Sequence, residues 1–114
     1  SAVCDHLLKK NENVILACAA WKDRVNIEDT LFAGAVIERL KKHFKLSGDS
    51  SQIANTLYKS AKKDLFAFMK KHEASHYHRL MGFGLEKDIR YCLTDDGANV
   101  LPLYADGKLV STSV

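Results

Sequence analysis

The sequence is poor in proline and has no long apolar run. It contains one proline among 114 residues, and none of its apolar stretches approaches the roughly 20 residues that a membrane-spanning helix needs. Its amino terminus also lacks the basic and then apolar pattern of a secretory signal. Neither a membrane protein nor an exported protein is therefore expected.

Cysteine is scarce and odd in number. The three cysteines are Cys4, Cys18 and Cys92, and an odd count argues against a disulfide framework. Cys18 and Cys92 lie in apolar runs, so we expect both to be buried free thiols, with Cys18 structural rather than a nucleophile. Free thiols predict a reducing cytoplasm as the location.

The sequence has no glycine-rich phosphate loop and no alternation of aromatic and basic residues. Its formal net charge of +3 is spread over short basic runs such as 41–42 and 62–63, which are typical of a solvated helix face. We therefore expect no nucleic-acid partner. A pI of about 8.8 keeps a small nucleotide- or nucleic-acid-binding domain as an alternative.

Composition and length indicate one globular domain over residues 1–114. Hydrophobic residues make up 46% and charged residues 27%, which are ordinary values for a folded domain. The chain starts at Ser1 without an initiator Met and enters an amphipathic stretch within two residues, so we expect its amino terminus to be cut rather than natural.

Apolar periodicity predicts an α/β fold with a short buried strand, several helices and a carboxyl-terminal hairpin. The buried strand is residues 14–20, where a continuous apolar run is typical of a sheet covered on both faces. The expected helices are 3–10, a segment from 26 to about 43–46, a long helix from 49 through 68, and shorter helices over 73–81 and 85–91. The expected hairpin joins 99–104 to 109–110 through the Asp106-Gly107 turn.

The segment from residue 14 to residue 40 is the most informative for function. Ligands of open α/β sheets bind beyond the carboxyl ends of strands, where helix amino termini present free N–H groups. Glu28 and Asp29 fall in the first turn of the predicted helix, and two carboxylates there can hold Mg²⁺. The alternative is a capping box, in which Asn26 caps the helix and Asp29 reaches back to it.

Several motifs resemble one enzyme family. Residues 18–20 (Cys-Ala-Ala), followed after a loop by residues 28–35 (Glu-Asp-Thr-Leu-Phe-Ala-Gly-Ala), are similar to the Cys-Ala-Gly and Glu-Asp-Thr-Leu-Cys-Ala-Gly-Ala segments of the 2-phosphosulfolactate phosphatase (ComB-like) family. Residues 75–80 (Ser-His-Tyr-His-Arg-Leu) resemble its Ser/His-Gly-Arg-Arg-Leu motif. Residues 100–103 and 106–109 resemble its Val-Val-Pro hairpin.

The resemblance implies a three-layer α/β/α protein. It also implies a Mg²⁺-dependent phosphatase that hydrolyses the phosphate monoester of a small sulfonated or carboxylated hydroxy acid, such as 2-phosphosulfolactate, in coenzyme M biosynthesis or a related pathway. Family members are longer, and the Asp-Val-Leu-Arg-Ala-Thr segment of their first half is not found here. The chain is therefore expected to be the carboxyl-terminal half, inactive alone, with the missing amino-terminal half as its partner.

The resemblance also implies roles for individual residues. Glu28 and Asp29 bind Mg²⁺, and Asp29 and His76 are the catalytic residues, with His76 protonating the leaving oxygen. Thr30, or the amides of its turn, holds a phosphate oxygen, and Arg79 clamps a phosphate or sulfonate. The competing interpretation is a solvated surface cluster, because His72, His76 and Arg79 form one stripe if the helix is unbroken.

Three positions depart from the family pattern. Ala20, at the expected phosphate-binding turn, stands where the family has Gly, Tyr77 replaces another Gly, and His78 replaces an Arg. Ala20 and Tyr77 can tighten a turn meant for phosphate, which would remove activity while keeping the fold. Trp21 is expected to be a lid or packing group over the loop, with a ligand platform as the alternative.

A second class of function stays open from the residues alone. The chain can be a non-catalytic half-domain that acts as a structural or oligomerisation module, because a strand meant for the middle of a larger sheet presents unpaired edges. Such a module is expected to form a homo-oligomer.

Overall fold

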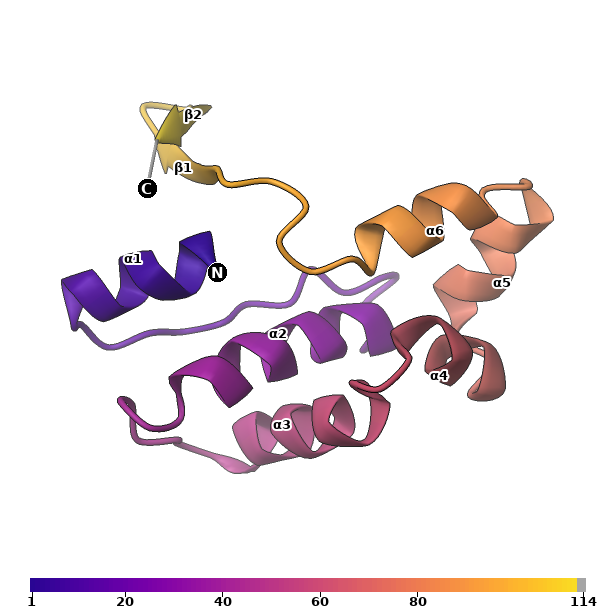
Figure 1. Cartoon of the computed structure of the whole chain (residues 1–114), viewed down its shortest axis with the longest axis horizontal. Helices are drawn as coiled ribbons and strands as arrows, with labels where there is room; N and C mark the ends of the chain where they lie inside the picture. Colours follow the sequence, from indigo (N-terminus) through magenta and orange to yellow (C-terminus); the bar gives the residue numbers. More distant parts are fainter. Residues whose placement is uncertain (113–114) are drawn as a thin grey trace.

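Figure 1 shows the computed structural model, which describes residues 1–112 as six helices and one antiparallel hairpin. The elements in chain order are α1 (Ala2–Lys10), α2 (Ile27–Leu40), α3 (Asp49–Ala61), α4 (Leu65–Lys71), α5 (Ser75–Gly82), α6 (Glu86–Cys92), β1 (Leu101–Ala105) and β2 (Lys108–Thr112). This mixture of helix and strand is consistent with the predicted α/β class. None of the helices in this range has the length and apolar character needed to cross a bilayer.

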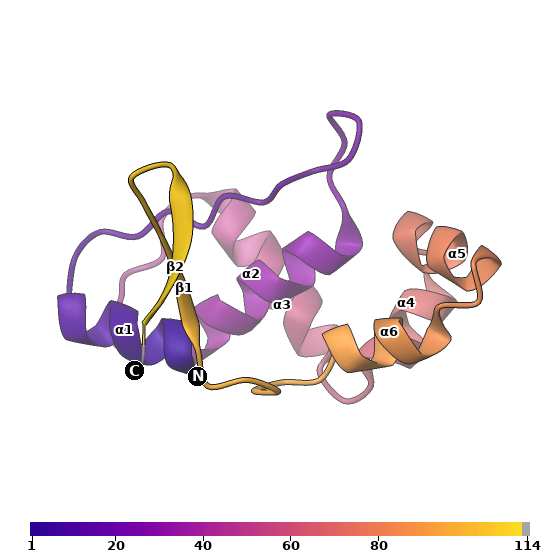
Figure 2. The same cartoon turned by 90° about the horizontal axis from the view of Figure 1, so that it is seen from above.

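Helix α2 is the central element of the fold. Acidic residues in its first turn suit the helix dipole, and seven of its fourteen residues are buried. Helix α3 runs back along α2 (Figures 1 and 2), and the two approach closely at Gly34. A Cβ at Gly34 would lie 2.1 Å from the backbone oxygen of Ala54, so only glycine permits this separation.

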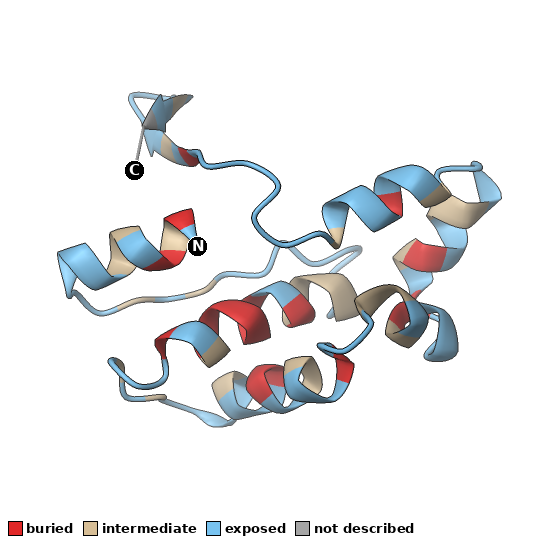
Figure 3. Cartoon of the chain, viewed as in Figure 1, coloured by how far each residue is buried: buried red, intermediate tan, exposed pale blue. Residues whose placement is uncertain are grey.

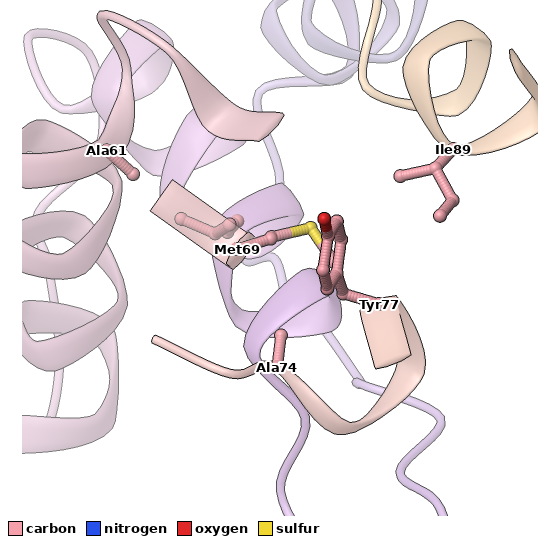
Figure 4. Close-up of a cluster of buried hydrophobic side chains, with 6 residues drawn as sticks. Ala61, Met69, Ala74, Tyr77 and Ile89 are labelled. Carbon is pink, nitrogen blue, oxygen red and sulfur yellow. The ribbon is translucent and has the colours of Figure 1, made fainter. Parts of the chain in front are cut away.

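A cluster of buried side chains joins α2 and α3 to the three short helices α4, α5 and α6. Figure 4 shows Met69 of α4 reaching the ring of Tyr77 on α5. The buried members are Leu31, Ala61, Met69, Ala74, Tyr77 and Ile89. Tyr77 is 6% exposed and also meets Phe66 edge to face, so the expectation that it tightens a phosphate-binding turn was wrong. It fills the core from the first turn of α5.

The long helix predicted over 49–68 is divided into α3 and α4. Helix α3 ends at Ala61, and the Asp64 carboxylate accepts a hydrogen bond of 2.8 Å from the Ala67 N–H, which begins α4. An aspartate side chain satisfies the free amides of a helix start better than it supports a helix interior. The apolar spacing continued across the break, which is why periodicity alone missed it.

The predicted buried strand over residues 14–20 does not form within residues 1–112, because no neighbouring strand in the part of the chain that the structure describes pairs with it. The segment runs alongside α2 without pairing to another strand (Figures 1 and 2) and is largely exposed (Figure 3), with Ile15 at 92% exposure. Leu16 packs against buried residues of α2. One face of this segment is therefore covered, while the sheet expected beside it is absent from residues 1–112.

The burial predicted for two of the cysteines was wrong. Cys18 and Cys92 are exposed, contrary to expectation, because no layer covers the extended segment and Cys92 ends α6 on an open side. Cys4 is buried against α2, and desolvation raises the pKa of its thiol. The described cysteines are all free, as expected.

The hairpin is confirmed. Ala105 pairs with Lys108 across a tight turn in which Asp106 and Gly107 have φ values of 51° and 78°. Positive φ at both central positions is the type I′ geometry that Asp-Gly favours. Pro102 lies in β1 of this two-stranded sheet, where every strand is an edge, as its missing N–H requires.

A strained turn connects the extended segment to α2. Ala20, Lys22 and Asp23 have φ values of 66°, 52° and 57°, a left-handed conformation that costs an L-residue other than glycine about 1–2 kcal/mol. Trp21 and Arg24 exchange two backbone hydrogen bonds of 3.1 Å across the turn. The glycine that the family carries at the position of Ala20 therefore has a conformational reason.

Gly34→Ala is expected to destabilise the protein by about 1–3 kcal/mol, because its methyl group must push α2 away from α3. Urea unfolding followed by circular dichroism measures the change. The matched control is Gly82→Ala at the end of α5, where an added Cβ meets nothing within 4 Å and the change is expected to be neutral or stabilising. Equal effects of the two substitutions would contradict the close approach.

Glu38 gives the fold a predictable acid sensitivity. Hydrogen bonds of 2.8 Å from Lys41 and from Asn55 on α3 lower the pKa of its carboxyl from 4.5 to about 2. Since the folded-state pKa lies below the unfolded one, this stabilisation is present above pH 4.5 and is lost as the pH falls toward 2. Thermal unfolding between pH 6 and 2 should show a flatter pH dependence in Glu38→Gln, whereas the exposed control Glu12→Gln should follow the parent.

Ala20→Gly is expected to stabilise the protein by about 0.5–1 kcal/mol, because relief of the left-handed strain exceeds the entropy that glycine adds to the unfolded chain. The control Ala19→Gly, at a neighbour without positive φ, should be neutral or destabilising. A denaturation midpoint that shifts the same way in both variants would refute the strain at residue 20.

Candidate active site

The start of α2 is built around the backbone carbonyl of Asn26. The Thr30 hydroxyl donates to that carbonyl at 2.7 Å, and the Thr30 N–H donates to it at 3.2 Å. The Asn26 side chain makes no capping hydrogen bond to the helix; its Nδ2 donates to Asp29 Oδ2 at 3.5 Å instead. The predicted capping box is therefore absent, and the amides of residues 27–29 have no partner within the helix.

Asp29 holds the strained turn against α2. Its Oδ2 accepts a hydrogen bond of 3.0 Å from the Ala20 N–H. The amide of Ala20, expected to face a phosphate, is thus engaged by a protein carboxylate. The hydrogen bonds of Asp29 within residues 1–112 use Oδ2 only, so Oδ1 stays available.

Glu28 of α2 and His76 of α5 are in direct contact. Glu28 Oε1 lies against His76 Nδ1, and the two side chains are 25% and 17% exposed. The geometry is that of an ion pair when the imidazole is protonated, and not of an ordinary hydrogen bond. Both carboxylate oxygens and His76 Nε2 are consequently buried without a hydrogen-bond partner in the described part of the chain. Unsatisfied buried polar atoms are uncommon and are typical of functional sites.

Trp21 links this pair to Arg79. Its ring meets the His76 ring edge to face at 5.5 Å, and the Arg79 guanidinium carbon lies 4.5 Å from the indole centroid. This is a cation–π contact, and none of the guanidinium N–H groups has a hydrogen-bond partner among residues 1–112. The strained turn therefore places an indole between an imidazole and a guanidinium that keeps its donors.

His72 is not part of this group. Helix α4 ends at Lys71, and Glu73 has a φ of 48°, so the chain changes direction before α5 begins. The His72 ring packs 4.3 Å from Phe68. The interpretation of His72, His76 and Arg79 as one continuous surface stripe was wrong, because it required an unbroken helix.

No set of three His, Cys, Asp or Glu side chains among residues 1–112 forms a group able to hold a metal ion by itself. Glu28 Oε2, which has no partner within residues 1–112, and Asp29 Oδ1 are hard ligands at the start of one helix. Mg²⁺ commonly takes one or two carboxylates and completes its shell with water and substrate phosphate. The carboxylate oxygens of Glu28 and Asp29 are compatible with this kind of Mg²⁺ coordination.

Glu28, Asp29, His76 and Arg79 were candidates from the sequence, whereas the position of Trp21 between His76 and Arg79 was not predicted. Glu28 and His76 meet as expected of residues that share a site, while Thr30 and Ala20 have their donors engaged within the protein. Trp21 was expected to pack over the loop, and its ring contacts His76 and Arg79 of α5, which nothing in the sequence indicated. His78, the third departure, is exposed beside Tyr77.

The chain is similar to several curated proteins that carry the same name. The chain is 36% identical over 110 residues to a Thermotoga petrophila protein named "Probable 2-phosphosulfolactate phosphatase", covering 96% of this chain and 46% of the relative. Proteins of the same name from Caldanaerobacter subterraneus subsp. tengcongensis (34% over 114 residues, 99% and 46% covered) and Synechocystis sp. (31% over 105 residues, 89% and 43% covered) are also similar. The chain thus spans about half the length of these relatives.

No solved structure matches the chain. The family model described as 2-phosphosulpholactate phosphatase matches residues 1–107, which is nearly the whole sequence. On that match, and on relatives more than 30% identical, the chain belongs to the 2-phosphosulpholactate phosphatase family.

Proposed function

We propose that this chain is the carboxyl-terminal half of a Mg²⁺-dependent phosphatase that hydrolyses the phosphate monoester of a small sulfonated or carboxylated hydroxy acid, such as 2-phosphosulfolactate. The observation that carries the proposal is the contact of Glu28 with His76, whose ring, like the Arg79 guanidinium, lies against Trp21. An acid, an imidazole and a guanidinium are the groups that phosphate-ester hydrolysis uses.

Glu28 and Asp29 are the residues that would hold Mg²⁺. The ion supplies neutralisation of the phosphoryl oxygens and orientation of the ester when it is bound. Asp29 keeps its second role in this proposal, because Oδ2 fixes Ala20 and the turn while Oδ1 faces no protein donor.

His76 is the proposed proton donor to the leaving oxygen. Glu28 occupies Nδ1, so the proton that can be given away is the one on Nε2, which has no protein partner among residues 1–112. The carboxylate also holds the imidazole in one orientation, as acids behind catalytic histidines do.

Arg79 and the amides of residues 27–29 are the proposed oxyanion donors. The Arg79 guanidinium lies over the Trp21 ring and has no hydrogen-bond partner among residues 1–112, so its fork of donors is available to a phosphate or sulfonate. Thr30 has both donors committed to Asn26, so its contribution is to hold the helix start that presents those amides.

We also propose a three-layer α/β/α arrangement, a role in coenzyme M biosynthesis, a cytoplasmic location and a homo-oligomer. The length of the relatives supports a missing half, from which further catalytic residues are expected.

A non-catalytic structural module is the second candidate. The extended segment before Ala20, which is exposed and unpaired, favours association as a role of this chain. Activity measurements on a family-length protein separate the two candidates.

The first test uses a chimera in which this chain replaces the matching segment of the Thermotoga petrophila relative. We expect the chimera to release phosphate from 2-phosphosulfolactate only with Mg²⁺, and Glu28→Gln to lower kcat/KM about 100-fold because a ligand to the ion is lost. Glu12→Gln, an exposed acid far from α2's start, is the control. Turnover that is indifferent to a chelator would reject the metal role.

Arg79→Ala is expected to raise the KM of the same chimera about 10- to 100-fold, because a charge-assisted contact to the anionic ester is lost. Arg90→Ala is a close control, since Arg90 also stacks on an aromatic ring, at 3.6 Å from the Phe66 centroid, but away from the site. Steady-state kinetics that change equally in both variants would assign Arg79 to stability instead.

A further inference from the structure

We propose that residues 13–19, which we term the open strand, accept a β-strand supplied by the rest of a family-length protein. The inference concerns how the chain is completed and does not depend on the phosphatase activity. It rests on backbone groups without partners, on alternating burial and on the length of the relatives.

The backbone of the open strand has no partner in this structure. Within residues 1–112, no backbone–backbone hydrogen bond involves residues 12–19, and the next amide along the chain, that of Ala20, donates to a side chain. The segment runs past the whole length of α2 without a helical turn (Figure 1). An extended run with free N–H and C=O groups on both sides is a template for strand addition.

Burial alternates over residues 14–17 with the period of a β-strand, and the alternation ends at Cys18, which is exposed. Val14 and Leu16 are half-buried, and Leu16 packs against two buried clusters of α2, whereas Ile15 and Ala17 are exposed. One face already lies on a helix, as in a sheet with a helical layer. The other face presents Ile15 at 92% exposure.

The open strand has none of the features that protect a natural sheet edge. Residues 14–20 are Val-Ile-Leu-Ala-Cys-Ala-Ala, with no charge and no proline. Natural edge strands are usually short or carry lysine, proline or a bulge. This composition is typical of a strand with neighbours on both sides and cover on both faces.

The length of the relatives indicates which part of a family-length protein pairs with the open strand. The Thermotoga petrophila relative is matched over 46% of its own length, so the larger part of such a protein lies outside this chain. That part can supply neighbouring strands and an apolar layer over Ile15. A second copy of this chain, pairing open strand to open strand, covers one edge only and leaves the other edge free.

Hydrogen exchange in the chimera defined above, compared with the 114-residue chain alone, tests the proposal. We expect the amides of residues 13–19 to exchange at least about 100-fold more slowly in the chimera, while those of 98–100 stay fast in both proteins. Equal exchange of the open strand in the two proteins, or a chimera that does not fold, would overturn the proposal.

Proline substitution supplies a second readout. Ala17→Pro removes one amide from an exposed extended position, so it should leave the melting temperature of the chain alone nearly unchanged and lower that of the chimera clearly, by about 5 °C or more. Ala98→Pro, at another exposed position outside any element, should have little effect in either protein. Equal effects of the two prolines in the chimera count against the proposal.

The chain alone is also examined by light scattering across concentrations. A monomer with a fast-exchanging open strand supports the proposal. A dimer in which residues 13–19 become protected assigns the edge to a second copy and overturns it.

Discussion

The close approach of α2 and α3 at Gly34 is the constraint on which the rest of this structure depends. Because residue 34 has no side chain, the backbone of α3 can lie directly against α2, and the apolar residues around it become buried. Glu38 then reaches Asn55 across the same interface, which adds a buried polar contact between the two helices. The extended segment packs along one side of the α2–α3 pair, and the three short helices pack at its end.

The candidate site is located where this pair meets the short helices. The amino end of α2 presents Glu28, and the buried cluster around Tyr77 fixes α5 so that His76 points at it. Tyr77 and His76 are neighbours in sequence: Tyr77 anchors the helix in the buried cluster, and His76 is the proposed proton donor. The Tyr77 side chain is thus packed into the core beside the candidate site.

The turn over residues 20–24 stores strain beside the site. Three residues in the left-handed region persist only where surrounding contacts hold them. Here Asp29 accepts the Ala20 amide at the start of the turn, and the Trp21 ring contacts His76 and Arg79 of α5. The same turn ends the open strand. A strand that pairs with the open strand would therefore lie next to the strained turn, which contacts the groups proposed to bind the ester.

Local chemistry in the sequence determined a large part of this fold. The Asp-Gly hairpin, the helix that starts after Asn26 and the short helices around residues 75–92 were predictable because turn residues and apolar periodicity act over a few positions. The likeness of residues 28–35 to a family motif indicated the right family for the same reason, since a motif is local. The division at Asp64 was missed because two local signals competed there.

Only the tertiary structure decided which distant groups meet and which segments find partners. The contact of Glu28 with His76, and the place of Trp21 between His76 and Arg79, depend on how α5 packs, which no spacing in the sequence encodes. Residues 14–20 have the composition of a buried strand, yet a strand becomes buried only when neighbours supply hydrogen bonds and cover. Residues 1–112 do not supply them, so the same sequence remains an exposed extended segment.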